Sequence, residues 1–329
     1  MIKVQGARIR TPATTANFGP GFDCVGLALD LYNEVEAFWE EPVTGKFASQ
    51  RAFEAELKTQ TELEVYGEGA SLLVASGAEL FFKALAYLLA QRQVLPRRLK
   101  VVMKNKIPLS RGLGSSAAGI VAALYLAKEI LTSAGFPLEK ETLAKAAVHL
   151  EGHPDNVLPA LYGGAGLSWP GTDGELDWVP FSVPSELHFV LAVPEIQVST
   201  SEARRVLPKR VPLKIAVENS ALLAGLILSL GEKNYSKLRS LIQGPLHVPY
   251  RSGMIPGYRQ VEEAAYNSGA LAFTISGSGP TVLALTLQDP EQVGKAMVEA
   301  FRKHGQIDAW FFISKVEQFG TTVKRIDRP

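Results

Sequence analysis

The chain has 329 residues, of which 47% are hydrophobic, so it can bury a large core and has the length of two domains. Its formal net charge of +1 argues against a nucleic-acid-binding protein and against polybasic attachment to a membrane. A single cysteine, Cys24, excludes an internal disulfide and a zinc site made of several cysteines. No apolar run of signal-peptide length opens the chain, and the apolar run at residues 221–230 is about half of a membrane span. These features predict a soluble, cytoplasmic protein.

The amino-terminal part of the chain combines strands with one long turn. Residues 12–23, PATTANFGPGFD, have the proline, glycine, threonine and asparagine content of a surface turn. Asn17 and Asp23 in this turn either satisfy its own backbone or face a ligand. The elements expected up to residue 89 are a strand that includes Val4, Ala7 and Ile9, a strand over residues 29–39 and a helix over residues 71–89.

Residues 108–124, PLSRGLGSSAAGIVAAL, form a tight loop between a strand with one buried face and an apolar helix. Gly112 and Gly114 permit positive φ and the close approach of a ligand, and Ser115 or Ser116 is expected to cap the helix. A helix that begins on such a loop directs free N–H groups at one point, which favours an anion such as phosphate. The alternative is that the glycines only let the helix cross close to the strand.

This loop resembles the second motif of the GHMP small-molecule kinases, where it binds the phosphates of ATP, and it matches neither a Walker A loop nor the dinucleotide fingerprint. PATTANFGPGFDCVGLAL, from Pro12, resembles the first motif in its homoserine kinase form. LAFTISGSGPTVLAL, from Leu271, resembles the third, although its glycines alone are typical of a hairpin turn. The resemblance assigns ATP binding to Pro108, Leu109, Ser110, Arg111, Gly112, Leu113, Gly114, Ser115, Ser116, Ala117 and Ala118, and pocket support to Gly277, Ser278 and Gly279.

A cluster of polar side chains lies in residues 151–164, EGHPDNVLPALYGG. The cluster is either a plain junction between helix and loop or a site in which Glu151 faces a metal and its neighbours face a substrate. Mg²⁺ takes one or two protein oxygens beside phosphate oxygens and water, and Glu151 with the Ser116 hydroxyl could supply them. The segment resembles the E-G-H-x-D-N run of homoserine kinases, in which the glutamate is the metal ligand and the histidine and aspartate lie at the amino-acid site.

Two arginine-containing segments stand in the carboxyl half. STSEARRVLP, from Ser199, is expected to be a loop whose arginines are either solvated or bind a carboxylate. It resembles a homoserine kinase segment that singles out Arg204, and HVPYRSGMIPG, from His247, resembles one that singles out Arg251. Gly244 replaces an aspartate common in these kinases, which we interpret as a lost structural contact. Helices are expected over residues 138–150, 213–230, 261–267 and 293–301, and strands over residues 188–195, 310–316 and both sides of the glycine turn in 271–285.

The resemblance covers nearly the whole chain and implies an α+β, two-domain GHMP kinase fold. A ribosomal-protein-S5-like, ATP-binding amino-terminal domain would span residues 1–168, and a ferredoxin-like domain residues 169–329, with the boundary in the Gly- and Pro-rich segment 162–174. The implied activity is Mg²⁺-dependent transfer of the ATP γ-phosphoryl group to the side-chain hydroxyl of L-homoserine, in threonine biosynthesis, by a cytoplasmic homodimer. The implied ligands are Asn17, Asp23, His153, Asp155, Arg204 and Arg251 for the substrate and Ser116 and Glu151 for the metal, and the candidate catalytic residues are Asp155 and Asn156.

Two alternatives stand beside this hypothesis. Another GHMP kinase, acting on mevalonate or a sugar, would have little use for two arginines and an ammonium-binding carboxylate around one small substrate. A non-catalytic nucleotide-binding relative would not need both candidate Mg²⁺ oxygens. We find no aspartate helped by a cation, the arrangement that activates the hydroxyl in mevalonate kinase and galactokinase, so the resemblance implies catalysis by positioning and charge stabilisation.

Overall fold

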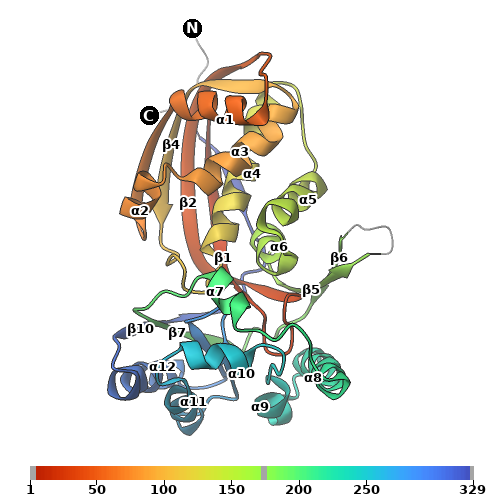
Figure 1. The fold of residues 1–329 in the computed structure, drawn as a ribbon, viewed down its shortest axis with the longest axis vertical. Helices are drawn as coiled ribbons and strands as arrows, with labels where there is room; N and C mark the ends of the chain where they lie inside the picture. The colour runs from red at the N-terminus through yellow and green to blue at the C-terminus, as the bar shows by residue number, and fades with distance from the viewer. Residues whose placement is uncertain (1–4, 172–175, 327–329) are drawn as a thin grey trace.

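The computed structural model describes residues 5–171 and 176–326 and contains two β-sheets, one above the other, with helices packed against them (Figure 1). Val4 and residues 172–174 of the expected boundary segment lie outside the described residues. The first sheet has the order β11 (Thr322–Arg325), β1 (Gln5–Ala16), β2 (Val25–Thr44), β4 (Val94–Asn105) and β3 (Thr61–Gly67), with β5 (Ala165–Pro170) paired to β2 and β6 (Leu176–Phe181) paired to β5. The second sheet has the order β10 (Ala309–Ser314), β7 (His188–Pro194), β9 (Val282–Thr286) and β8 (Ala272–Ile275).

Strand β1 continues into the segment that the sequence predicts as a turn. Residues 13–16 pair with β2, as in Ala13 opposite Leu29, and the register shifts between Pro12 and Ala13. Because proline lacks an N–H group, a bulge is a position in a ladder where it is tolerated. The long turn therefore begins only at Asn17, and β1 carries its side chains directly up to it.

The helices flank both sheets. In Figure 1, α3, α4 and α6 lie against the first sheet, and α5 packs on the outer side of α4 and α6. Helices α11 and α12 lie beneath the second sheet, and α7 lies where the two halves meet. The helices are α1 (Gln50–Thr59), α2 (Ala70–Ala75), α3 (Glu79–Gln91), α4 (Ser115–Ser133), α5 (Lys140–Glu151), α6 (Pro154–Tyr162), α7 (Thr200–Arg205), α8 (Leu213–Gly231), α9 (Leu238–Leu241), α10 (Val248–Arg251), α11 (Tyr258–Asn267) and α12 (Pro290–Ala300), with single turns η1 (Tyr235–Lys237), η2 (Ser252–Met254) and η3 (Phe301–Gly305).

Two expectations about helices are wrong. The single helix expected over residues 71–89 is divided into α2 and α3, because Gly77 and Ala78 take positive φ values of 60° and 46°. The loop expected after Ser199 instead contains α7, since the Ser199 and Glu202 side chains form a capping box at its first turn. The α7 helix positions Arg204.

The hydrophobic core connects the two sheets. Along β7 the side chains alternate, so Phe189 and Leu191 belong to a cluster that includes Phe18 of the first half, whereas Val190 and Ala192 pack with residues of α11 and α12. After β10, the chain returns through a bridge between Leu29 and Val316, and β11 pairs with β1. Both ends of the described chain therefore contribute to the first sheet.

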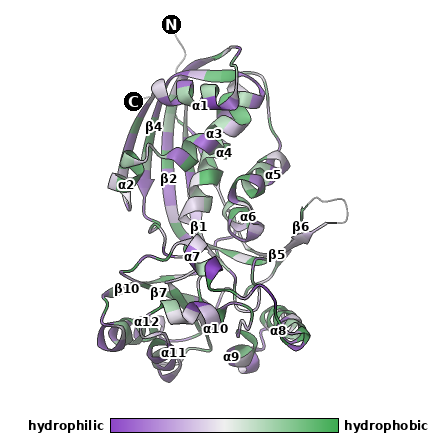
Figure 2. Cartoon of the chain, in the orientation of Figure 1, coloured by the Kyte–Doolittle hydropathy of each residue, from purple (hydrophilic) through white to green (hydrophobic). Residues whose placement is uncertain are grey.

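Within the described residues, two helices, α4 and α8, are long and apolar enough to span a membrane when judged by length and composition alone. Each has 19 residues. Within the best window, 67% of α4 is buried but only 22% of α8. Figure 2 shows hydrophobic residues along α8, and Leu213, Val217 and Leu228 are exposed large apolar side chains. The apolar run at residues 221–230 thus belongs to α8, which confirms the helix expected over residues 213–230.

Candidate active site

The loop before α4 has the backbone geometry of an anion site. Gly112 and Gly114 have φ values of 73° and 68°, and Gly114 is the N-cap of α4. The expectation that Ser115 or Ser116 caps this helix is wrong, since both serines lie in its first turn and no side chain of the described residues forms a cap hydrogen bond at Gly114. The N–H groups of that first turn lack partners within the helix and can bind a ligand.

Neither loop glycine can be replaced without a clash. A Cβ atom on Gly114 would lie 1.9 Å from Thr14 Oγ1, and one on Gly112 would lie 2.2 Å from the Ser276 carbonyl oxygen. The Thr14 N–H donates to the Leu113 carbonyl at 3.1 Å, and Ser276 Oγ donates to the Gly112 carbonyl at 2.7 Å. The loop is thus clamped between β1 and the turn that joins β8 to β9. That turn, residues 276–281, connects two antiparallel strands and also packs on the loop.

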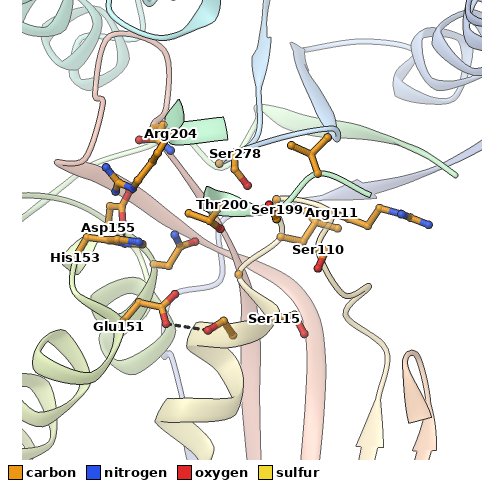
Figure 3. A pocket seen from close by; sticks show the side chains of 18 of the residues that line it. Ser110, Arg111, Ser115, Glu151, His153, Asp155, Ser199, Thr200, Arg204 and Ser278 are labelled. Atoms are coloured by element: carbon orange, nitrogen blue, oxygen red, sulfur yellow. Dashed lines mark hydrogen bonds and ion pairs between the residues drawn. The ribbon is translucent and has the colours of Figure 1, made fainter. Parts of the chain in front are cut away.

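The clamped loop forms one end of a cavity of about 190 Å³ (Figure 3). The predicted residues that line it include all six substrate candidates, both metal candidates and Asn156. Pro108, Ala117 and Gly279 line neither this cavity nor the one beside it. The full lining is Asn17, Asp23, Ser110, Arg111, Gly112, Leu113, Gly114, Ser115, Ser116, Glu151, His153, Asp155, Asn156, Val198, Ser199, Thr200, Arg204, Arg251, Gly277 and Ser278.

Glu151 and Ser116 approach each other at the floor of the cavity. Glu151 is the last residue of α5, and Gly152 ends that helix in the left-handed conformation. Ser116 Oγ donates to Glu151 Oε2 at 2.8 Å, the dashed line in Figure 3. Burial raises the pKa of Glu151 above its usual value. A carboxylate and a hydroxyl oxygen therefore stand together beside the N-terminus of α4.

The start of α6 places three polar side chains on the same wall. His153 Nδ1 and Asp155 Oδ1 are 2.8 Å apart, and the hydrogen bond to Asp155 raises the pKa of His153. Asp155 is only 1% exposed, so its carboxylate is held in place. Thr14 Oγ1 donates to Asn156 Oδ1 at 2.7 Å, which fixes the Asn156 amide beside the loop that precedes α4.

The turn after β1 meets α7 across the cavity mouth. Asn17 and Asp23 have φ values of 55° and 56°, and Asn17 Oδ1 accepts a hydrogen bond from the Asp23 N–H at 2.9 Å. Arg204 donates to both carboxylate oxygens of Asp23, at 2.9 Å each. The sequence left two roles open for Asn17, a hydrogen bond to the backbone of its own turn or a contact with a ligand. The side chain makes the first and also lines the cavity.

Arg251 is a buried cation whose partners are carbonyl groups. It is 2% exposed, and its Nε and Nη1 donate to the carbonyls of Ala203, at 3.3 Å, and Gly277, at 2.9 Å. Within residues 5–171 and 176–326, no carboxylate forms an ion pair with it, and burial lowers its pKa to about 10. The Phe22 ring centroid lies 5.2 Å from its guanidinium and 6.0 Å from that of Arg204. An anion in this cavity would compensate both cations.

The structure gives a steric reason for Gly244. A Cβ atom there would lie 2.5 Å from the Gly19 carbonyl oxygen and 2.8 Å from His247 Nε2, so the aspartate common in related kinases has no room. His247 Nε2 donates to the Gly19 carbonyl at 2.8 Å, and its ring stacks on Phe22 at 5.5 Å. Burial lowers the pKa of His247 to about 4. Neutral His247 therefore fixes the turn that carries Asn17 and Asp23.

A second cavity, of about 540 Å³, shares Ser110, Ser115 and Ser116 with the first. Most of its other lining residues are apolar and come from β2, α2, α3, β4 and α4. The polar or charged ones are Asn33, Ser76, Glu79, Lys83 and Asn105. The predicted ATP residues Leu109 and Ala118 also line it. Leu73 of α2 lines this cavity, whereas its neighbours Ser71 and Leu72 do not.

The sequence matches the families described as GHMP kinases N terminal domain, over residues 79–164, and GHMP kinases C terminal, over residues 220–305. It is 40% identical over 309 residues to homoserine kinase of Carboxydothermus hydrogenoformans, covering 94% of each chain. The chain belongs to the homoserine kinase family of GHMP kinases. A second member, from Halothermothrix orenii, is 36% identical over 96% of each chain. The crystal structure of homoserine kinase from Cytophaga hutchinsonii superposes with a TM-score of 0.79 and 29% identity, over 97% of each chain.

Several cavity residues of this GHMP kinase were missed by sequence reasoning. Val198, Ser199 and Thr200 line the cavity from the start of α7, a segment expected to be a loop. The Ser-Thr-x-Glu spacing is a capping-box signal and could have revealed the helix. Arg111 is directed away from Glu151 and His153 in Figure 3, and its Nη1 donates to the Ile196 carbonyl. The Arg111 guanidinium thus holds the chain before α7.

Proposed function

We propose that this GHMP kinase transfers the γ-phosphoryl group of ATP to the side-chain hydroxyl of L-homoserine, forming O-phospho-L-homoserine for threonine biosynthesis. One observation carries the proposal: Arg204 and the buried Arg251 share a cavity with the free N-terminus of α4. Homoserine has a carboxylate for the two guanidinium groups and an ammonium for Asp23. Its hydroxyl would then extend toward the phosphate loop.

The phosphates of ATP would bind at residues 108–118. The free N–H groups of the first turn of α4 and its positive dipole end favour the triphosphate, and the loop glycines allow it to approach the backbone. The adjoining apolar cavity would hold the nucleoside, because it shares Ser110, Ser115 and Ser116 with the phosphate site. Asn33 and Asn105 are the side-chain amides in that lining that could hydrogen-bond a base.

Glu151 and Ser116 fit a Mg²⁺ ion. Their oxygens lie 2.8 Å apart beside the phosphate loop, and the raised pKa of Glu151 shows a carboxylate that burial makes costly to ionise without a cation. When bound with ATP, Mg²⁺ neutralises charge on the phosphates. The carboxylate and the hydroxyl would hold it at this edge of the site.

Positioning can account for the chemistry of this site. Asp155 is fixed by His153, and Asn156 is fixed by Thr14, so both side chains face the region between substrate and phosphate with restricted freedom. Because phosphoryl transfer is loose, orientation of the hydroxyl and stabilisation of charge supply most of the catalysis. Asp155 and Asn156 would orient the hydroxyl and its proton.

An assay of ADP formation with three alcohols tests the function. We expect turnover with L-homoserine and none above background with mevalonate or galactose, because the two arginines have no partner on those substrates. The product should carry its phosphate on the side-chain hydroxyl, which phosphorus NMR can verify. Turnover of mevalonate or galactose instead would show another GHMP kinase, and absence of ADP with all three would show a non-catalytic relative.

Two further properties are predicted from the sequence. Composition predicts a cytoplasmic location, and the family resemblance implies assembly as a homodimer. Light scattering of the purified chain measures the second directly, and a monomer mass would contradict it. Both stay predictions.

A further inference from the structure

The ion pair between Asp23 and Arg204 spans the mouth of the cavity. It joins the turn after β1 to α7 through two hydrogen bonds of 2.9 Å, which is the bidentate geometry that guanidinium and carboxylate groups prefer. The side chains of Arg204 and Asp23 are 39% and 34% exposed, so a solute arriving from solvent can reach both. The protein thus presents a joined cation and anion at the entrance to its substrate site.

These two groups are also the proposed ligands for the opposite charges of homoserine. We propose that the Asp23–Arg204 pair is exchanged for the ammonium and carboxylate of the amino acid, and that it selects against alcohols that carry only one of these charges. This inference rests on the proposed function and deepens it. The ammonium of the bound amino acid then pairs with Asp23, and its carboxylate pairs with Arg204. Each charge released from the broken pair therefore has a new partner of opposite sign.

A substrate with one charge cannot make this exchange. A monoanion that takes Arg204 leaves Asp23 without its ion-pair partner, in a region that also contains the Asp155 carboxylate. A monocation that takes Asp23 leaves Arg204 unpaired near Arg251, and the two guanidinium groups repel each other. In both cases the side chain that is left without its ion-pair partner opposes binding.

The Asp23→Asn variant removes the ion pair with little change in shape. Asp23 has a φ of 56°, a conformation that asparagine tolerates well, and its N–H bond to Asn17 is retained. The probe is γ-hydroxybutyrate, which has the hydroxyl and carboxylate of homoserine but no ammonium. Calorimetric titration should show this anion binding about fivefold more tightly to Asp23→Asn than to the unaltered protein, the size expected of a partly exposed pair. Binding of L-homoserine should weaken.

Glu202→Gln is the matched control for a general change in electrostatic field. It also removes one negative charge close to Arg204 on α7, but Glu202 does not line the cavity. We expect γ-hydroxybutyrate to gain clearly less affinity in this variant. The reciprocal variant, Arg204→Gln, should bind propanolamine, which lacks the carboxylate, more tightly than the unaltered protein does, and it provides the measurement if Asp23→Asn does not fold.

The possible failures are distinguishable. Unchanged affinity for γ-hydroxybutyrate in Asp23→Asn, or an equal gain in Glu202→Gln, would overturn the exchange while the unaltered protein still phosphorylates homoserine. An unaltered protein that neither binds nor phosphorylates homoserine would overturn the proposed function itself. Opposite responses of homoserine and γ-hydroxybutyrate to Asp23→Asn, with the smaller gain in the control, would support the exchange.

Discussion

Charge in the cavity is compensated residue by residue, and the exceptions indicate where ligands bind. Asp155 is paired with His153, and Asp23 with Arg204. Among the described residues, the hydrogen-bond partners of Arg251 are carbonyl groups, and that of Glu151 is a serine hydroxyl. A buried cation and a partly buried carboxylate without full ionic partners are costly unless a ligand completes them. The substrate carboxylate would complete the first and Mg²⁺ the second.

Glu151 should make Mg²⁺ binding dependent on pH. Burial raises its pKa, and Mg²⁺ competes with the proton, so the apparent Mg²⁺ affinity should fall as the pH falls toward and below that raised pKa. The loss should approach about tenfold for each pH unit below the pKa. Initial rates measured against Mg²⁺ concentration at several pH values would show it. The Glu151→Gln control should bind Mg²⁺ weakly and should lack this pH dependence of the Mg²⁺ affinity. The same pH dependence in the control would contradict the proposal that Glu151 binds the metal.

Asp155→Asn separates positioning from general-base catalysis. A general base contributes about 100-fold to 10,000-fold to the rate. Since we assign Asp155 to orientation, we expect its replacement to raise the KM for homoserine and to lower kcat by less than about 100-fold. Steady-state kinetics at saturating ATP measure both. A much larger fall in kcat with an unchanged KM would instead identify Asp155 as the base.

Short elements carry much of the site, and α7 is the clearest example. It has six residues, too few to be stable alone, and its capping box compensates for this. Ser199 Oγ accepts the Glu202 N–H at 3.1 Å, while Glu202 Oε2 accepts the Ser199 N–H at 3.0 Å. Arg251 adds a bond to the Ala203 carbonyl. The orientation of Arg204 therefore depends on contacts outside the cavity.

The cap of α7 should therefore control substrate binding from a distance. Glu202 is exposed and does not line the cavity, so Glu202→Ala removes half of the capping box without removing a proposed substrate contact. We expect the KM for homoserine to rise about threefold with kcat nearly unchanged. Glu202→Gln is the control, because glutamine also completes a capping box. Equal KM values in the two variants would show that the cap does not position Arg204.

The proposed phosphate loop before α4 should also be sensitive to substitution. Gly114→Ala would place a Cβ atom 1.9 Å from Thr14 Oγ1 at a φ of 68°, so α4 or β1 must move. We expect the KM for ATP to rise at least tenfold, with a lower melting temperature. Gly231→Ala, at the end of α8, is the control, because a Cβ there meets no described atom within 4 Å. Normal ATP kinetics in Gly114→Ala would contradict the proposed phosphate site.

Local sequence signals predicted those elements that local physics decides. Residues 99–104 alternate in burial as one face of β4, and α4 follows the glycine loop, because periodicity and glycine spacing are properties of the segment itself. Strands β6 and β11 were not predicted, since each is short. In addition, β11 pairs with β1 at the other end of the described chain, whereas β6 forms a hairpin with β5. The Asp23–Arg204 pair joins residues 181 apart in the sequence, and sequence reasoning assigned both to the substrate without pairing them. Long-range contacts of this kind are not encoded in local spacing.

At the scale of the whole molecule, the two halves share one hydrophobic cluster, and the chain passes from one half to the other and back. The cluster that contains Phe18 and Leu27 also contains Phe189 and Leu226 from the carboxyl half. The active cavity uses side chains from both halves, so relative movement would disperse it. We propose that the boundary between residues 1–168 and 169–329 divides the order of elements along the chain and does not separate two independent cores. Residues 168 and 169 both lie within β5, and β11 returns to the first sheet.

This shared core predicts that both halves unfold together. Trp39 is buried in the first half, where its indole N–H donates to Ser133 Oγ at 3.3 Å, and Trp310 lies on β10 of the second sheet. Variants that keep only one of these tryptophans, with the others replaced by phenylalanine, should show the same denaturant midpoint by fluorescence, because loss of the second sheet would expose the cluster around Phe189. A lower midpoint at Trp310 would show instead that the carboxyl half unfolds first, and would make the proposed boundary an energetic one.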